Sequence, residues 1–90
     1  MKEIIRKATA GTMESSDVYV EIEPKHNGLS IALESVVKEQ FGQSILDTVQ
    51  EVLKNCGVEN AQLRIADRGA LDCVIRARLE TAIMRGRGEN

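Results

Sequence analysis

Aromatic and histidine side chains are scarce in this 90-residue sequence. Tyr19 and Phe41 are its only aromatics, tryptophan is missing, and His26 is the single histidine. Proteins that bind nucleic acid usually present a strongly basic face, and those that bind single strands stack bases on aromatic side chains. A net charge of −2 and two aromatics therefore argue against nucleic acid as a partner. One histidine also leaves little material for a zinc site or a Ser–His pair, and we expect neither catalytic nor metal-binding residues.

Cysteine and long apolar runs are equally scarce. Cys56 and Cys73 are too few for a disulfide scaffold, and their spacing does not suit a metal site. We interpret Cys73 as packed or half-buried in a helix rather than reactive. No stretch approaches the roughly 18 uninterrupted apolar residues of a membrane-spanning helix, and residues 1–7 lack the pattern of a signal peptide. We therefore expect a cytoplasmic protein without a membrane partner.

The length and composition suit one small globular domain. Ninety residues leave no room for a second core, and 42% hydrophobic with 29% charged residues indicates a packed interior with a well-solvated surface. We expect residues 1–90 to form a single domain whose ends, 1–7 and 86–90, are flexible.

Alternating apolar residues predict strands in the first half of the chain. The predicted strands are residues 8–13, 18–23 and 29–34. In the second strand Val18, Val20 and Ile22 should face the core, because successive strand residues point to opposite faces. The Asn27–Gly28 pair is typical of a turn. The short connections predict that these three strands form an antiparallel meander.

The apolar period changes to three and four residues from about Ser35, which predicts a helix. Its apolar face consists of Phe41, Ile45, Val49, Val52 and Cys56. Because Gly42 weakens the first turns, this helix begins either at Val36 or only near Gln43, and Gly57 ends it. Residues 60–66 then read as a fourth strand.

A final helix is predicted over about residues 70–85. Its apolar stripe is Leu71, Val74, Ile75, Leu79, Ala82 and Ile83. The resulting order is β-β-β-α-β-α, in which the last strand can pair parallel to a neighbour through a crossover. We predict an α+β fold: a two-layer sandwich of a roughly four-stranded sheet with both helices on one face.

Four consecutive polar residues, 14–17, interrupt the apolar pattern between the first two strands. Serine and aspartate side chains bond readily to nearby backbone amides, so this composition alone is typical of residues that only form a turn. A surface turn also suits a covalent attachment at Ser15. The turn supplies no base, so a separate transferase would have to activate that hydroxyl. Glu14 and Asp17 would repel a phosphorylated donor.

Ser44 and Lys25 are two other residues that can be compared with the attachment points of known carriers, and neither has the matching neighbours. Fatty-acid and polyketide carriers are modified at an Asp-Ser-Leu segment that starts a helix, but Ser44 lacks the preceding aspartate. Their all-helical fold also conflicts with the β-rich first half, so we interpret Ser44 as a surface residue. Biotin and lipoyl carriers use a lysine in a hairpin, yet the neighbours of Lys25 do not resemble those motifs.

Several segments together resemble the citrate lyase acyl carrier proteins. The matching segments are residues 10–15 (AGTMES), 39–42 (EQFG), 67–73 (DRGALDC) and 75–80 (IRARLE). They occur in the family's order, and the similarity runs from about Ala10 to Arg85. The family is modified at the serine of an A-G-T-x-E-S segment, so the resemblance implies attachment at Ser15. The sequence alone leaves the adjacent Ser16 as an alternative.

The resemblance implies a carrier subunit rather than an enzyme. In this family a 2'-(5''-phosphoribosyl)-3'-dephospho-CoA group is bound to the serine by a phosphodiester, and its thiol holds acetyl or citryl thioesters. The implied partners are alpha- and beta-type subunits, which together cleave citrate to acetate and oxaloacetate, and a holo-carrier synthase that attaches the arm. The alternative is a small interaction or regulatory module without a prosthetic group.

The role of the arginines in the basic C-terminal part stays open. These residues are Arg68, Arg76, Arg78 and Arg85. A guanidinium can bind phosphates or carboxylates bidentately, so they could contact the arm's phosphates or dock an acidic partner. Alternatively, they form a solvated face.

Overall fold

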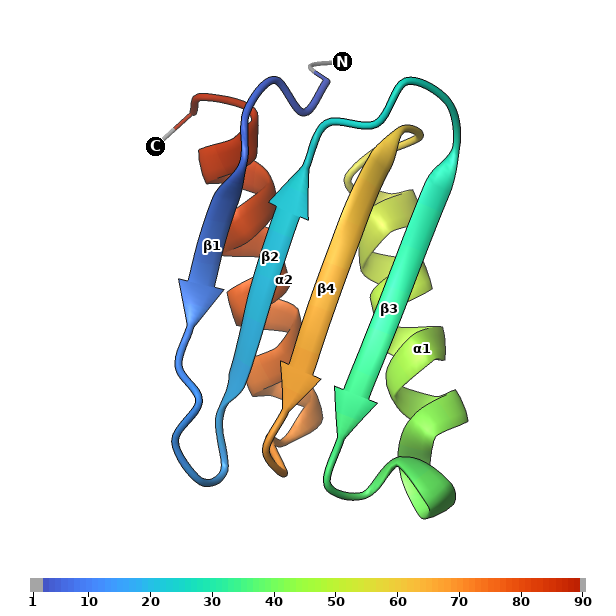
Figure 1. Ribbon diagram of the computed structural model, residues 1–90, viewed down its shortest axis with the longest axis vertical. Helices are drawn as coiled ribbons and strands as arrows, with labels where there is room; N and C mark the ends of the chain where they lie inside the picture. Colours follow the sequence, from blue (N-terminus) through green and yellow to red (C-terminus); the bar gives the residue numbers. More distant parts are fainter. Residues whose placement is uncertain (1–2, 90) are drawn as a thin grey trace.

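The computed structural model describes residues 3–89 and packs two helices against a four-stranded sheet (Figure 1). In chain order the elements are β1 (Ala8–Gly11), β2 (Val18–Glu23), β3 (Leu29–Ser35), α1 (Lys38–Asn55), β4 (Ala61–Asp67) and α2 (Asp72–Gly86). The predicted α+β class and the order β-β-β-α-β-α are therefore confirmed. Neither helix within residues 3–89 is long and apolar enough to cross a membrane.

The order of strands in the sheet shows that the predicted meander was wrong. The strands lie in the order β1-β2-β4-β3, so β2 pairs with β4 and not with β3. The β1–β2 and β2–β4 pairs are antiparallel. β3 and β4 are parallel, with Leu29 opposite Ala61 and Ser35 opposite Asp67. The expected parallel pairing of the last strand is confirmed, and α1 forms its crossover.

The link between β2 and β3 explains this arrangement. Residues 24–28 do not close a tight hairpin but cross the start of β4 (Figure 1). There the Gly28 amide donates to Asn60 Oδ1 at 2.7 Å, and the Gly28 carbonyl accepts from the Ala61 amide at 3.0 Å. Alternate residues of β4 are buried along its whole length, whereas β3 is exposed or half-buried throughout. The more deeply buried β4 thus takes a central place, and β3 forms an edge of the sheet.

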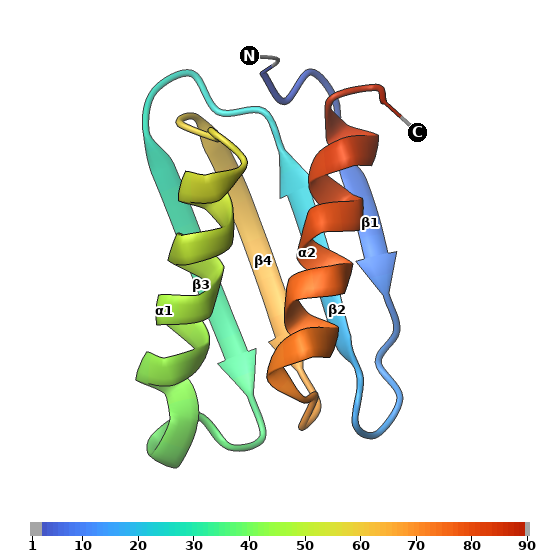
Figure 2. The same cartoon turned by 180° about the vertical axis from the view of Figure 1, so that it is seen from behind.

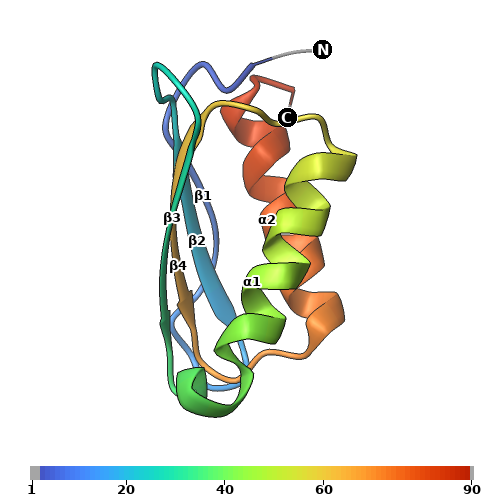
Figure 3. The same cartoon turned by 90° about the vertical axis from the view of Figure 1, so that its right-hand side faces the viewer.

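Both helices cover the same face of the sheet and form the second layer (Figures 2 and 3). Val18, Val20 and Ile22 of β2 are fully buried, as their alternation predicted. The helices contribute the buried residues Ile45, Val49, Val52, Leu53, Ile75, Leu79, Ala82 and Ile83. Since burial of one large aliphatic side chain is worth roughly 1.5–3 kcal/mol, this aliphatic layer supplies the main stabilisation of the fold.

Three predicted burial assignments near the helix starts were wrong. Phe41 is 53% exposed on α1, and Leu71 is 71% exposed and caps α2 instead of joining its apolar stripe. Cys73 is exposed rather than packed. All three lie in or just before the first turns of a helix, at the end of the two layers, where fewer neighbours can cover an apolar side chain.

The element boundaries also differ in detail from the prediction. β1 ends at Gly11 rather than at residue 13, and α1 begins at Lys38, between the two predicted starts. Gly11 has a φ of +91°, and a Cβ there would lie 1.8 Å from the Val18 carbonyl oxygen, so only glycine fits this close approach.

The segment before β1 lies beside the C-terminal end of α2. Ile4 is buried in the core, and the Ile5 amide donates to the Gly86 carbonyl at 2.8 Å. The single domain with flexible ends at 1–7 and 86–90 stays a prediction. Of those ends, residues 1, 2 and 90 lie outside the part that the structure describes.

Candidate functional site

Ser15 lies in the exposed loop that joins β1 to β2. The Asp17 amide donates to the Glu14 carbonyl at 3.2 Å, which closes a turn with Ser15 and Ser16 at its two central positions. Within residues 3–89 the Ser15 hydroxyl makes no hydrogen bond. The predicted turn is confirmed, and Ser15 presents its oxygen freely to solvent.

The backbone of this loop is bound to the end of β4. The Ser16 amide donates to the Arg68 carbonyl at 2.8 Å, and the Arg68 amide donates to the Asp17 carbonyl at 2.9 Å. These two bonds extend the β2–β4 ladder into the loop. Ser16 has a φ of +66°, the left-handed region that L-residues seldom adopt. Because the ladder fixes Ser16, the neighbouring Ser15 has a defined place on the surface.

The Asp17 carboxylate fixes the other side of the loop. It accepts bonds from the Thr12 hydroxyl at 2.7 Å and from the Val18 amide at 2.7 Å. Arg78 of α2 adds a bidentate pair, with Nε at 3.1 Å and Nη2 at 2.8 Å. Together these donors, Arg78 first, hold the pKa of Asp17 well below its usual range. The expected repulsion of a phosphorylated donor is therefore reduced, because Arg78 compensates the Asp17 charge.

The loop contains an accessible hydroxyl, that of Ser15, to which no carboxylate or imidazole within residues 3–89 is hydrogen-bonded. The loop that carries His26 lies between β2 and β3, at the opposite end of the sheet from the β1–β2 loop (Figure 1). Asp17 is a poor base because four donors occupy its carboxylate and lower its pKa. This geometry suits a hydroxyl that another enzyme modifies better than one that attacks a substrate itself.

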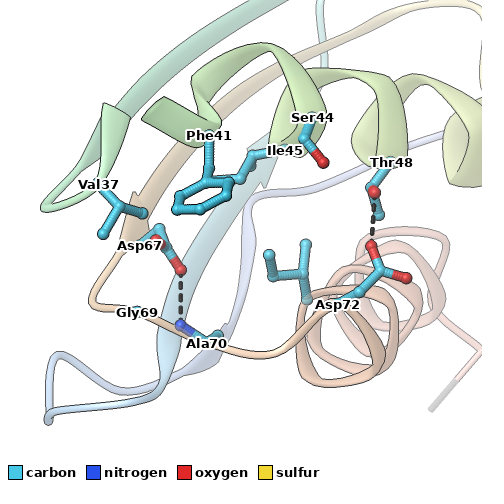
Figure 4. Close-up of a pocket in the computed structure, with 10 residues that line it drawn as sticks. Val37, Phe41, Ser44, Ile45, Thr48, Asp67, Gly69, Ala70 and Asp72 are labelled. Carbon is cyan, nitrogen blue, oxygen red and sulfur yellow. Dashed lines mark hydrogen bonds between the residues drawn. The ribbon is translucent and has the colours of Figure 1, made fainter. Parts of the chain in front are cut away.

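A groove of about 250 Å³ opens between the first turns of α1 and the segment that joins β4 to α2 (Figure 4). Phe41 and Ile45 form its apolar wall, and Ser44 lies on its rim as the surface residue that the sequence predicted. Thr48 donates to Asp72 at 2.6 Å across the two helices. The groove thus joins the two helix starts at the same end of the sheet as the β1–β2 loop.

Asp67, at the end of β4, is a structural residue that sequence reasoning missed. It is 1% exposed, and its carboxylate accepts from the Ser35 hydroxyl at 2.8 Å and from the Ala70 amide at 3.0 Å (Figure 4). Because this buried carboxylate has hydrogen-bond partners on both sides, it links the ends of β3 and β4 to the segment that leads into α2. Nothing in the Asp67-Arg68-Gly69 sequence indicates that the carboxylate of Asp67 is buried.

The structure shows different surroundings for the four arginines whose role the sequence left open. Arg76 binds Asp72 at 2.7 Å and Glu51 at 2.9 Å, and both carboxylates raise its pKa. Arg78 holds Asp17, and Arg85 Nη1 donates to the Thr9 carbonyl at 2.8 Å. Arg68 alone of the four makes no side-chain hydrogen bond or ion pair within residues 3–89.

Comparison with known proteins assigns the family. A family model described as the malonate decarboxylase delta subunit (MdcD), an acyl carrier protein, matches residues 5–86. The citrate lyase acyl carrier protein of Escherichia fergusonii is 52% identical over 84 residues, which cover 92% of this chain and 87% of that protein. The corresponding protein of Halothermothrix orenii is 46% identical over 83 residues, which cover 92% and 88% of the two chains.

A solved structure shares the fold. A chain of the Pseudomonas malonate decarboxylase hetero-tetramer, crystallised in complex with malonate, superposes with a TM-score of 0.82 at 25% identity. The match covers 92% of this chain and 86% of that one. The sequence matches, the family model and the fold agree, and the chain belongs to the family of the citrate lyase acyl carrier proteins.

Proposed function

We propose that this chain is the acyl carrier subunit of a citrate lyase complex and that Ser15 bears its covalent arm. The supporting observation is the Ser15 hydroxyl, which is exposed and free of hydrogen bonds on a loop held by β4 and α2. The family resemblance supports the same residue, because Ser15 ends the matching AGTMES segment.

The surroundings of Ser15 fit a large substituent. The side chain lies on a surface turn, so an added group extends into solvent and displaces no core residue. No hydrogen bond within residues 3–89 has to break when the hydroxyl becomes an ester. The arm proposed from the family is 2'-(5''-phosphoribosyl)-3'-dephospho-CoA, whose terminal thiol carries acetyl and citryl groups as thioesters.

Attachment follows from the chemistry of a serine hydroxyl. Ser15 Oγ attacks the phosphorus of a polyphosphorylated donor form of the arm, and an O–P bond forms as the bond to the phosphate leaving group breaks. The hydroxyl proton passes to a base of the transferase, because the loop has no suitable base of its own. This requirement supports a holo-carrier synthase as a partner.

The chain itself would contribute attachment, reach and docking rather than acid–base groups. Alpha- and beta-type subunits would act in turn on the same arm, releasing acetate and then oxaloacetate from citrate in the cytoplasm. A covalent arm makes both encounters effectively intramolecular, which raises the local concentration of the acyl group and retains it between steps.

Mass spectrometry after co-expression with the matching synthase tests this proposal. We expect one coenzyme-sized adduct, localised to Ser15 in the peptide digest. Ser15→Ala should lose the adduct and all citrate cleavage in the reconstituted complex, whereas the matched Ser16→Ala should keep both. An adduct on Ser16 would move the site by one residue. Citrate cleavage retained by Ser15→Ala would contradict the carrier function and favour an interaction module.

A further inference from the structure

Arg68 has a position and a chemical state that the other arginines near the loop lack. Its backbone forms the two ladder bonds to Ser16 and Asp17, at 2.8 and 2.9 Å. A single peptide unit separates Ser16 from Ser15, so the Ser15 and Arg68 Cα atoms lie within about 10 Å of each other. The residue is exposed, and its guanidinium is unpaired within residues 3–89. An unpaired guanidinium therefore belongs to a residue whose backbone is fixed beside the Ser15 loop.

The other cations near the loop are already engaged. Arg78 donates two hydrogen bonds to the Asp17 carboxylate, and Arg76 pairs with the carboxylates of Asp72 and Glu51. Arg85 lies about two helical turns beyond Arg78 on α2 and donates to the Thr9 carbonyl. Arg68 is thus the guanidinium in this group that can bind an additional anion without breaking an existing bond.

A cation near Ser15 would offset negative charges that the proposed attachment brings together. A phosphodiester at Ser15 would place a negative charge next to the exposed carboxylate of Glu14. Arg78 compensates Asp17 but leaves Glu14 without a partner within residues 3–89. A planar guanidinium can bind two phosphate oxygens at once, which makes it well suited to offset this repulsion.

We propose that Arg68 binds the phosphate that joins the arm to Ser15, and the donor's phosphates while that bond forms. This inference rests on the proposed function and adds a phosphate-binding residue to it. Arg68 also lines a small hollow with Met13 of the Ser15 loop and with Val36 and the acidic Glu34 near the end of β3.

The test compares Arg68→Gln with Arg64→Gln. Both arginines lie on or just after β4, both are exposed, and each variant removes one positive charge. Arg64 lies four residues from Arg68 toward the other end of the sheet, and its ion pair with Glu21 is loose at 3.6 Å. Neither variant removes a buried contact, so circular dichroism should show both folded.

Two readouts report on the phosphate contact. The synthase should attach the arm to Arg68→Gln with a kcat/KM lowered about tenfold, as expected for one charge-assisted contact, and this loss should shrink at high salt. Arg64→Gln should match the wild type. In the modified carriers, the 31P resonance of the phosphodiester should shift in Arg68→Gln but not in Arg64→Gln.

The outcomes separate this inference from the proposed function. Equal attachment rates and an unchanged 31P resonance in Arg68→Gln would overturn the role of Arg68 while leaving Ser15 as the site. Equal losses in both variants would also overturn it, because they would indicate a general effect of net charge. Failure of the wild-type chain to take up the arm would instead overturn the carrier function itself.

Discussion

Ser16→Gly tests whether the turn that presents Ser15 stores backbone strain. Ser16 is the one non-glycine residue within 3–89 with a positive φ, at +66°. The left-handed conformation costs an L-residue roughly 1–2 kcal/mol, because Cβ approaches a neighbouring carbonyl oxygen. Glycine has no Cβ and adopts this conformation freely, so the substitution should remove the strain without moving the ladder bonds to Arg68.

The expected gain is the difference between two opposing effects. Glycine loses more backbone entropy on folding, which offsets roughly 0.5–1 kcal/mol of the relieved strain. The Ser16 side chain makes no hydrogen bond within residues 3–89, so its removal costs no polar contact. The free energy of unfolding should rise by about 0.5–1 kcal/mol. For a domain of this size that corresponds to a Tm higher by about 2–8 °C.

Thermal and urea unfolding of the unmodified chain, followed by circular dichroism, measure this change. Ser15→Gly is the matched control: Ser15 has no positive φ, so only the entropic effect remains and its Tm should stay level or fall. A Tm for Ser16→Gly that is equal to or below the wild type would refute the reasoning. Ser16→Gly should in addition still accept the arm, whereas Ser15→Gly should not.

Two further predictions concern titratable groups. The folded pKa of Asp17 lies below its unfolded value, mainly because Arg78 donates to it, so its stabilisation is present above the unfolded pKa and is lost as pH falls below about 4. Acid unfolding followed by circular dichroism should show this loss in the wild type and a weaker one in Asp17→Asn; identical profiles would contradict the role of the pair. In the unmodified chain at pH 8, iodoacetamide should alkylate the exposed Cys73 before Cys56, whose pKa is raised by burial. Mass spectrometry of timed samples checks the order, and faster labelling of Cys56 would contradict it.

The local elements could be predicted because each has a short-range signal. The alternation over Val18, Val20 and Ile22 indicates a half-buried strand, and these residues are indeed fully buried. Spacings of three and four residues between apolar side chains likewise predicted both helices. These patterns show which side of each element is apolar. Because apolar sides pack against one another, they also predict a sheet layer and a helix layer that meet at their apolar faces.

The pairing of strands could not be predicted in the same way. A short connection favours a hairpin, yet residues 24–28 carry the chain across β4 instead. In the folded sheet the central β4 buries alternate side chains along its length, whereas the edge strand β3 does not. The sequence shows this difference only weakly, since both strands alternate, and the competition between two strands for the central place depends on the whole sheet.

The candidate site likewise has features that the sequence predicts and features that it does not. A polar turn at residues 14–17 was visible in the composition, but the choice of Ser15 came from the family resemblance. Asp17 and Arg78 lie 61 residues apart, and their ion pair has no local signature. Likewise, nothing in the sequence distinguishes Arg68 from Arg78, because pairing with a carboxylate depends on which elements meet in space.

The bonds around the loop suit the proposed carrier function, in which one flexible arm on Ser15 serves several partners. The loop is bound to β4 through Ser16 and to α2 through Asp17, two elements that are themselves part of the core. Effective concentration falls as the flexible tether lengthens, so a mobile loop would add to the arm's length and dilute its reactive end. Fixing the loop confines flexibility to the arm. As the proposed attachment site, Ser15 needs both an unhindered oxygen and an immobile backbone. The surface turn provides the first, and the ladder bonds and the Asp17–Arg78 pair provide the second.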